Sequence, residues 1–300
     1  MKKELRKNKK NGRSASASAV ARLVIWSIVL CLLVGVFAVM MALDLGFSSF
    51  YYGGDFMDFD DEDYRTGNGS TMEAVHEISI DWVAGSVTVL VTDGDEIRVT
   101  EDYDGEKDAR RMRWLVEDGE LSVKYSRPKL AVGAEEAKNL TVEIPRAALT
   151  KLVELQVSTV SAAQDISVSV RELDVDTVSG RVNVRGDYES VDAESTSGDV
   201  CFDGSFREGS FDSVSGAVEI RLQRQASVLD MDTVSGEMHL TLPRDTTGFR
   251  VDAESMGRTH ISGFDLDYNG TDRWGDGSMS ISMDGVSGKL TIEAAKEAEE

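Results

Sequence analysis

The chain contains little cysteine and little positive charge. Its two cysteines, Cys31 and Cys201, fall in a long apolar run and in an expected strand, so they are not expected to pair and no disulfide framework holds the chain together. The 32 lysine and arginine residues are outnumbered by 54 acidic ones, which gives a net charge of −22. Such a surface repels nucleic acid and attracts cations or basic partners. Nucleic-acid binding is therefore excluded.

Helical periodicity is missing from the second half of the chain, where one phrase returns instead. Its copies are TVSGRVNV, STSGDVCF, SVSGAVEI, TVSGEMHL and GVSGKLTI. Their turn glycines are Gly180, Gly198, Gly216, Gly236 and Gly288, so the first three steps are 18, 18 and 20 residues. Degenerate copies stand at Ala162 and Gly257. A period of about 20 residues predicts units stacked along one axis rather than a closed globular core.

Each copy alternates apolar and polar residues on both sides of its glycine. The second and fourth residues after the glycine are apolar, namely Val182 and Val184, Val200 and Phe202, Val218 and Ile220, Met238 and Leu240, and Leu290 and Ile292. The fifth and seventh residues before it follow the same rule, with Gly209 as the exception. Period-two alternation is typical of half-buried strands. The sequence therefore predicts an all-β fold, a β-solenoid-like stack of repeats of about 18–21 residues with two strands each.

The residues between the two strands predict a tight turn. Glycine is expected there because a positive φ costs it nothing. The serine before it is expected to bond local backbone and to stack as a hydroxyl ladder. These serines are Ser179, Ser197, Ser215, Ser235 and Ser287.

The N-terminal segment predicts one transmembrane α-helix ahead of the β fold. Residues 1–22 carry eight basic side chains against one acid, and Leu23 to Leu43 form a 21-residue run without a charge. That run is long enough to cross about 30 Å of hydrocarbon and longer than the apolar core of a signal peptide, which is the alternative. The basic flank is expected in the cytoplasm, which puts the rest of the chain outside. An extracytoplasmic domain without disulfides favours a bacterial envelope.

The predicted order is a basic cytoplasmic segment (1–22), the transmembrane helix (23–43), a flexible acidic and aromatic linker (44–71), the β domain (72–293, with regular repeats over 155–293) and a tail (294–300). The linker has a second interpretation as a docking segment for a basic partner. Sheet edges are expected at Ile80–Leu90 or Leu290–Ile292.

Three stretches carry a resemblance to a known family. They are HEISIDWVAGSVTVLVTDGDEIRVT, NLTVEIPRAALTKLVELQVSTVSA and the SG repeats that follow. Over roughly residues 72–293 the chain resembles the bacterial putative-adhesin domain of the toast-rack, LiaG-like type. The resemblance implies stacked β rungs and a family of largely unknown function that brings no catalytic residues. Members are often encoded near envelope-stress regulators, which implies an envelope-associated, non-catalytic role. The chain departs from the pattern at Ala162, near Met256 and at 264–277.

An acidic column is the main candidate site. Four residues before the turn glycines stand Asp176, Glu194, Asp212, Asp232 and Asp284. Stacked strands lie about 4.8 Å apart, so these carboxylates repel one another unless water or a cation intervenes. One interpretation is a solvated outward face, and the other is a weak metal site, with Ca²⁺ held by Asp176, Glu194, Asp212 and Asp232. The glycine pattern of calcium-binding β-rolls is missing, and no other cofactor is expected.

Three smaller candidates each have an ordinary structural interpretation beside a functional one. His239 and His260 both fall three residues after their glycines, which would place them on adjacent rungs as a transition-metal pair or as solvent-facing side chains. Arg185-Gly186-Asp187 is either a receptor-binding tripeptide or an ordinary corner. Residues 264–277 are expected to form a hairpin with turns at Asn269-Gly270 and Asp276-Gly277, with a calcium loop as the alternative.

The function predicted from these features is binding or sensing, without catalysis. No Ser–His–acid or paired-carboxylate constellation can be assigned by spacing. We expect a single-pass membrane protein whose extracytoplasmic domain serves as an accessory in the envelope-stress response, with another envelope or regulatory membrane protein as its partner. A surface adhesin or structural scaffold is the second hypothesis, and a cation-dependent polysaccharide-active enzyme is the third.

Overall fold

The computed structural model describes residues 59–60, 62–103, 105, 107–127, 137–255, 258–264 and 272–295. All of them belong to the second of two compact units, Asp55–Glu300, and the first unit is Met1–Gly54. The predicted transmembrane helix at 23–43 lies outside these ranges, as does the predicted basic segment. No helix among the described residues has the length and hydrophobicity needed to span a membrane.

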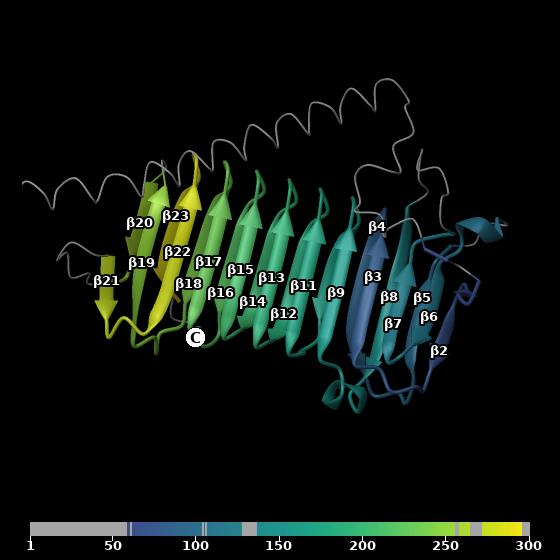
Figure 1. Cartoon of the computed structure of the whole chain (residues 1–300). Coiled ribbons are helices and arrows are strands. Elements are labelled where there is room, and N and C mark those ends of the chain that lie inside the picture. Colours follow the sequence, from purple (N-terminus) through teal and green to yellow (C-terminus); the bar gives the residue numbers. More distant parts are fainter. Residues whose placement is uncertain are drawn as a thin grey trace, which may run out of the picture. The chain divides into compact units, whose positions relative to one another are not determined.

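The described strands form two layers (Figure 1). Sheet A has twelve strands, in spatial order β1 (Arg65–Thr66), β6 (Arg113–Glu117), β7 (Glu120–Lys124), β3 (Glu77–Trp82), β9 (Glu154–Thr159), β11 (Glu172–Thr177), β13 (Ser190–Ser195), β15 (Glu208–Ser213), β17 (Val228–Thr233), β22 (Met279–Gly285), β19 (Gly248–Ser255) and β21 (Asp272–Gly275). Sheet B has eleven, β2 (Gly69–Thr71), β5 (Ile97–Glu101), β8 (Lys138–Pro145), β4 (Gly85–Thr92), β10 (Ala163–Ser167), β12 (Val182–Asp187), β14 (Val200–Ser205), β16 (Val218–Leu222), β18 (Glu237–Leu242), β23 (Lys289–Ala294) and β20 (Arg258–Ser262). Two short 3₁₀ helices are also described, η2 (Asp108–Arg110) and η3 (Ala148–Thr150).

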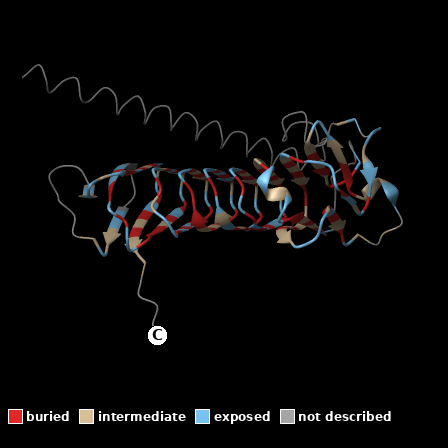
Figure 2. Ribbon diagram, turned by 90° about the horizontal axis from the view of Figure 1, so that it is seen from below, coloured by how far each residue is buried: buried red, intermediate tan, exposed pale blue. Residues whose placement is uncertain are grey.

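Each sequence repeat builds one rung, which we define as a strand of sheet A, a corner and a strand of sheet B. Successive rungs pair in parallel and in register, so Val175 pairs with Ala193 in sheet A and Val182 pairs with Val200 in sheet B. The apolar positions that the repeat predicted to face inward are buried between the sheets, and Figure 2 shows them alternating with exposed ones. The predicted all-β, solenoid-like stack is confirmed. Its stabilisation comes from continuous apolar columns, at about 25 cal/mol per Å² removed from water.

The one glycine in an inward column has a packing explanation. Gly209 occupies a position where the other rungs carry Leu173, Val191 and Leu229. A Cβ at Gly209 would lie 2.7 Å from the ring of Phe206, which already occupies that space. Phe206 also packs against Phe202 and Phe211, with ring centroids 5.2 and 5.8 Å away. An aromatic cluster therefore fills this rung in place of the missing side chain.

The turn glycines are required for a different reason from the one the sequence suggested. None of the five repeat glycines is among the glycines with positive φ. A Cβ at Gly198 would instead lie 2.0 Å from the carbonyl oxygen of Gly180, and one at Gly216 would lie 2.0 Å from that of Gly198. The positive-φ explanation was wrong. The corner backbones of neighbouring rungs pass too close for any side chain.

Two hydroxyl positions complete each corner. The serine before the glycine donates to a carbonyl of the preceding rung, as from Ser197 Oγ to Val178 O at 3.0 Å and from Ser215 Oγ to Thr196 O at 3.2 Å. In the rungs of Gly180, Gly198, Gly216 and Gly236, the hydroxyl three residues before the glycine is buried and bonds the glycine itself, as from Gly180 N to Thr177 Oγ1 at 2.9 Å. The bonds of the serines therefore run from hydroxyl to carbonyl between rungs, rather than from hydroxyl to hydroxyl.

The order of rungs at the C-terminal end departs from the order of the sequence. The last repeat, β22 and β23, lies between β17/β18 and β19/β20, and it pairs in parallel with both neighbours (Figure 1). Strand β21 then pairs antiparallel with β19. The predicted edge at Leu290–Ile292 is therefore internal, and β20 and β21 end the described sheets.

The N-terminal end is permuted in the same way. The rung of β3 and β4 pairs with β9 and β10, so the predicted edge at Ile80–Leu90 is also internal. Strands β7 and β8 form the next rung outward, and the antiparallel strands β5 and β6 lie beyond it. The sheets begin at Arg65, within the segment expected to be linker.

A buried ion pair fixes this N-terminal end. Lys138 Nζ lies 2.9 Å from Glu101 Oε2, and both side chains are buried. The ammonium also donates to the carbonyl of Arg110 and lies 4.1 Å from the ring centroid of Tyr125. A buried charge is tolerable only when it is paired and hydrogen-bonded in this way, so the pair ties β5 to β8.

Candidate binding face

The acidic column predicted from the sequence is a row of carboxylates on the outer side of sheet A. We call Asp176, Glu194, Asp212, Asp232 and Asp284 the first acidic row. Its members stand in register on consecutive strands, from β11 through β13, β15 and β17 to β22. Because neighbouring strands are about 4.8 Å apart, each carboxylate meets the next at close range.

A second row runs parallel to the first, and sequence reasoning missed it. It consists of Asp174 on β11, Asp192 on β13 and Asp230 on β17, with Ser210 between the last two. The signal was present, because these residues all stand six positions before a turn glycine. Together the two rows are called the acidic face below.

Burial and mutual repulsion raise the pKa of several carboxyls on this face. Burial, followed by the charges of Asp176, Asp192 and Glu194, raises the pKa of Asp174 to about 7. Burial, followed by the charge of Asp232, raises the pKa of Asp212 to about 6. The pKa values of the other affected members, Asp176, Glu194 and Asp232, are also raised, with burial as the largest cause. A carboxyl that is partly shielded from water and has like charges beside it favours its neutral form.

Basic side chains lie around the margins of the acidic face. Lys124 pairs with Asp81 on β3, at the N-terminal side of the rows. At the corners that lead into the strands, Arg171 lies 3.3 Å from Glu172 and Arg207 lies 2.6 Å from Glu208. In the described parts of the chain, no member of either row forms an ion pair with a basic side chain. The face therefore presents uncompensated negative charge.

The rows do not converge into a metal cage. No group of three or more His, Cys, Asp or Glu side chains within the described ranges is placed to hold a metal ion. Ca²⁺ requires six or more oxygens at about 2.3–2.6 Å, whereas a row supplies one carboxylate per strand. Weak cation association at Asp176, Glu194, Asp212 and Asp232 stays a prediction.

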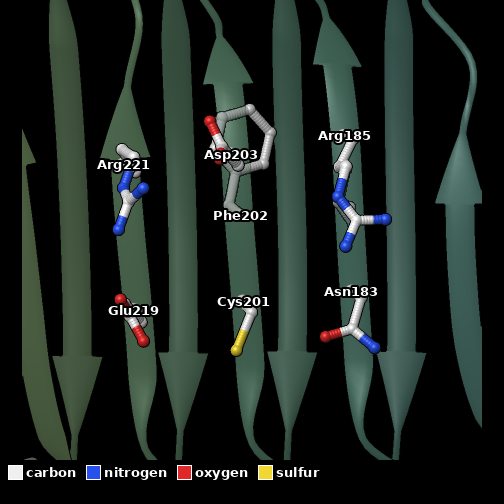
Figure 3. A pocket seen from close by; sticks show the side chains of 8 residues that line it. Asn183, Arg185, Cys201, Phe202, Asp203, Glu219 and Arg221 are labelled. Carbon is white, nitrogen blue, oxygen red and sulfur yellow. The ribbon is translucent and has the colours of Figure 1, made fainter. Parts of the chain in front are cut away.

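The outer side of sheet B carries mixed charge. Arg185 lies 3.4 Å from Asp165, Arg181 lies 2.9 Å from Asp199, and Arg224 lies 3.1 Å from Asp187. Figure 3 shows a shallow depression on this side, where Arg185, Asp203 and Arg221 form one row and Asn183, Cys201 and Glu219 form another. Burial, followed by the charge of Glu219, raises the pKa of the Cys201 thiol, which keeps it in its unreactive protonated form.

The predicted histidine pair is separated by a strand. His239 on β18 and His260 on β20 both stand in register with Thr291 of the inserted strand β23. His239 Nε2 instead lies 3.3 Å from Glu293 Oε1. The prediction of adjacent rungs was wrong because the last repeat is inserted out of sequence order.

The other two minor candidates lie on strands or partly outside the described residues. Arg185-Gly186-Asp187 lies within strand β12 rather than in a loop. Arg185 pairs with Asp165 on the adjacent strand β10, and Asp187 pairs with Arg224, which follows β16 two rungs away. Residues 272–275 form β21, and the turn at Asp276-Gly277 follows with Gly277 at φ 67°. The Asn269-Gly270 turn and the calcium-loop alternative at 265–270 lie outside the described residues.

The architecture matches that of a known protein family. The model of the Toastrack DUF4097 family matches residues 75–293, which is more than two thirds of the chain. The chain belongs to this family. The resemblance seen in the sequence is thereby confirmed, and the stacked sheets are those of a toastrack domain.

Three of the solved structures similar to this toastrack protein come from three different genera. A putative adhesin of Bacteroides fragilis is 13% identical, with 77% of this chain and 97% of that chain covered and a TM-score of 0.44. A putative lipid binding protein of Parabacteroides distasonis is 16% identical, with 79% and 98% covered and a TM-score of 0.40. A putative cell adhesion protein of Clostridium sporogenes is 9% identical, with 77% and 100% covered and a TM-score of 0.34. No curated protein matches the chain.

Proposed function

We propose that this toastrack protein is a non-catalytic binding protein of the bacterial cell envelope, and that it contacts a cationic partner through the acidic face of sheet A. The observation that carries the proposal is the pair of in-register carboxylate rows without basic partners among the described residues. Like charges on neighbouring strands destabilise a sheet by up to about 1 kcal/mol per pair. An arrangement that the fold does not need and that costs stability is best explained by a binding function.

The geometry favours an extended partner rather than a small molecule. The first acidic row continues over five consecutive strands, and the outward side chains of both rows lie on a sheet surface instead of lining a deep pocket. A basic segment that lies across the strands would meet one or two carboxylates about every 4.8 Å. Electrostatic attraction of this kind raises association rates and falls as salt rises, since charges are screened over about 8 Å at physiological ionic strength.

Residues 23–43 serve as the membrane anchor in this proposal, with the N-terminus in the cytoplasm. Support comes from their uncharged 21-residue run and from the basic flank of residues 1–22. An accessory role in the envelope-stress response rests on the family resemblance alone. The expected partner is another envelope or regulatory membrane protein with basic residues on its extracytoplasmic side.

The test is crosslinking capture from membranes with the full-length chain. The variant Asp192→Asn/Asp230→Asn neutralises two of the three carboxylates of the second row without changing their shape, and Asp165→Asn on sheet B is the matched control. We expect the double variant to capture the partner at least about tenfold less well, since two lost charge contacts are worth about 1.4 kcal/mol or more. Equal capture by wild type and double variant would exclude the acidic face. Product formation in a mixed-polysaccharide screen would instead support the enzyme hypothesis.

A further inference from the structure

The acidic face crowds together carboxyl groups whose burial and mutual repulsion disfavour full ionisation. Asp174 is surrounded by Asp176 on its own strand, Asp192 and Glu194 on β13 and Glu154 on β9. Its direct neighbour on β9 is Gln156, which is neutral. No cation among the described residues faces Asp174 from either adjacent strand.

Asp212 has the same kind of surroundings two strands further along. The charges that face it are Asp232 on β17 and Glu194 and Asp192 on β13, and a hydrogen bond from the backbone of Asp232 offsets part of their effect. On its own strand stand Ser210, which is neutral, and Glu208, which is already paired with Arg207. Carboxyls so placed lower their repulsion by taking up protons, and a protonated carboxyl can donate a hydrogen bond to an ionised neighbour.

We propose that the acidic face is a proton-responsive surface, which takes up protons, loses negative charge and stabilises the domain as the surroundings change from neutral to mildly acidic. The direction follows from linkage between proton binding and folding. The pKa values of Asp174 and Asp212, about 7 and about 6, lie above the usual 3.8, so the folded chain binds more protons than the unfolded chain in the interval between. Stability is therefore highest below that interval and is lost as pH rises through about 6 and about 7.

The consequence for binding, which rests on the proposed function, is release of a cationic partner on acidification. Each proton taken up removes one negative charge from the surface that attracts the partner. Capture should therefore be strongest at neutral and alkaline pH and should weaken as the rows become neutral. Most proteins lose stability on acidification because their carboxylates are paired in the folded state. This domain should show the opposite trend.

Thermal unfolding of the full-length chain in uncharged detergent, followed by the β-sheet circular dichroism signal, tests the inference. We expect the Tm of the wild type to be higher at about pH 5.5 than at about pH 8 by roughly 5 °C. In Asp174→Asn/Asp212→Asn the Tm at the higher pH should rise and the pH dependence should flatten. Asp165→Asn, on the charge-balanced sheet B, should keep the wild-type pH dependence. A wild-type Tm that falls on acidification would by itself overturn the inference. An unchanged pH dependence of the Tm in the double variant would overturn it as well.

Partner capture measured at the same two pH values separates the two proposals. If the Tm responds as expected and no partner is captured at either pH, the proposed function fails and the proton response stands. If a partner is captured but the Tm does not rise on acidification, the proton response fails and the proposed function stands. Capture that is equally strong at both pH values, despite the Tm response, would overturn proton-driven release.

Discussion

The outer sides of the two sheets have the same backbone geometry and opposite electrostatics. On sheet B, opposite charges meet across neighbouring rungs, as in the pairs of Arg185 with Asp165 and Arg181 with Asp199. On sheet A, like charges meet across neighbouring rungs, as Asp174 does with Asp192 and Glu194 with Asp212. Both sides belong to the same repeats, so the difference cannot come from the fold.

The contrast between the two sheets shows which positions of the repeat are fixed by packing and which can vary. Inward positions are fixed by packing, since their side chains, or at Gly209 the ring of Phe206, fill the space between the sheets. Outward positions are free, and sheet B uses that freedom to pair charges. The concentration of unpaired acids on sheet A, over the strands that the structure describes, runs against stability, which is why we assign function to that side.

The largest effect should come from breaking the corner that both faces share. In Gly198→Ala the new Cβ would meet the carbonyl oxygen of Gly180 at 2.0 Å, and that carbonyl belongs to the backbone of the neighbouring rung. Because the backbone cannot give way as a flexible side chain can, we expect the free energy of unfolding to fall by about 3 kcal/mol or more. Chemical denaturation of the full-length chain measures the loss.

The matched control for the corner is Gly94→Ala in an exposed turn. Its Cβ would approach nothing closer than the Thr92 side chain at 3.6 Å, so the change should stay within about 0.5 kcal/mol. If Gly198→Ala lowered the free energy of unfolding as little as this control does, the close approach of neighbouring rungs would not explain the glycine. The corner would then not be a shared constraint on the two sheets.

The regular array could be predicted from the sequence, whereas the ends could not. Apolar residues at fixed distances from each glycine sufficed to predict both strands of every regular rung and the inward side of each. The insertion of β22 and β23 was not predictable in this way, because every rung presents the same backbone edge and the same apolar column to a neighbour. Sequence order was then the only guide to spatial order, and it failed at both ends.

The positions of the acidic residues could be predicted from the sequence, whereas their surroundings could not. The first acidic row follows from one offset, and the second row from another that was equally visible in the sequence. The sequence does not show which side of the stack lacks cations. That depends on where Lys124, Arg171 and Arg207 lie relative to the rows, and their positions follow only from the strand order. The pKa shifts of Asp174 and Asp212 depend on burial, which a repeat alignment does not reveal.

Placing a cation in the middle of the acidic face should have the next largest effect. Ser210 lies in register between Asp192 and Asp230, so a lysine there would have a carboxylate on each side. We expect Ser210→Lys to stabilise the domain by about 1 kcal/mol at low salt and near neutral pH, with a smaller gain at high salt. Ser167→Lys on sheet B would face Arg185 and should be neutral or slightly destabilising. Equal effects from the two lysines would contradict the contrast between the faces.

Removing a paired charge from sheet B should matter less. Arg185 pairs with Asp165 at 3.4 Å, and both side chains are more than half exposed. Exposed pairs contribute about 0–1 kcal/mol, so Arg185→Ala should lower the stability by no more than that. Denaturant unfolding of wild type and variant at equal salt gives the difference. A loss of several kcal/mol would mean that sheet B also depends on its charges, and the assignment of function to sheet A alone would weaken.

Calcium should have the smallest effect on stability. Each row supplies at most one carboxylate per strand, so the rows attract cations to the surface without enclosing one. A weakly held ion should therefore act mainly through ionic strength. We expect millimolar CaCl₂ to change the Tm no more than NaCl at equal ionic strength does. A site that binds calcium tightly enough to be saturated about 100-fold would add about 2.7 kcal/mol, which a thermal melt would detect readily. A saturable rise in Tm that NaCl does not reproduce, and that Asp212→Asn removes, would establish the cation ladder and replace a purely electrostatic face with a metal site.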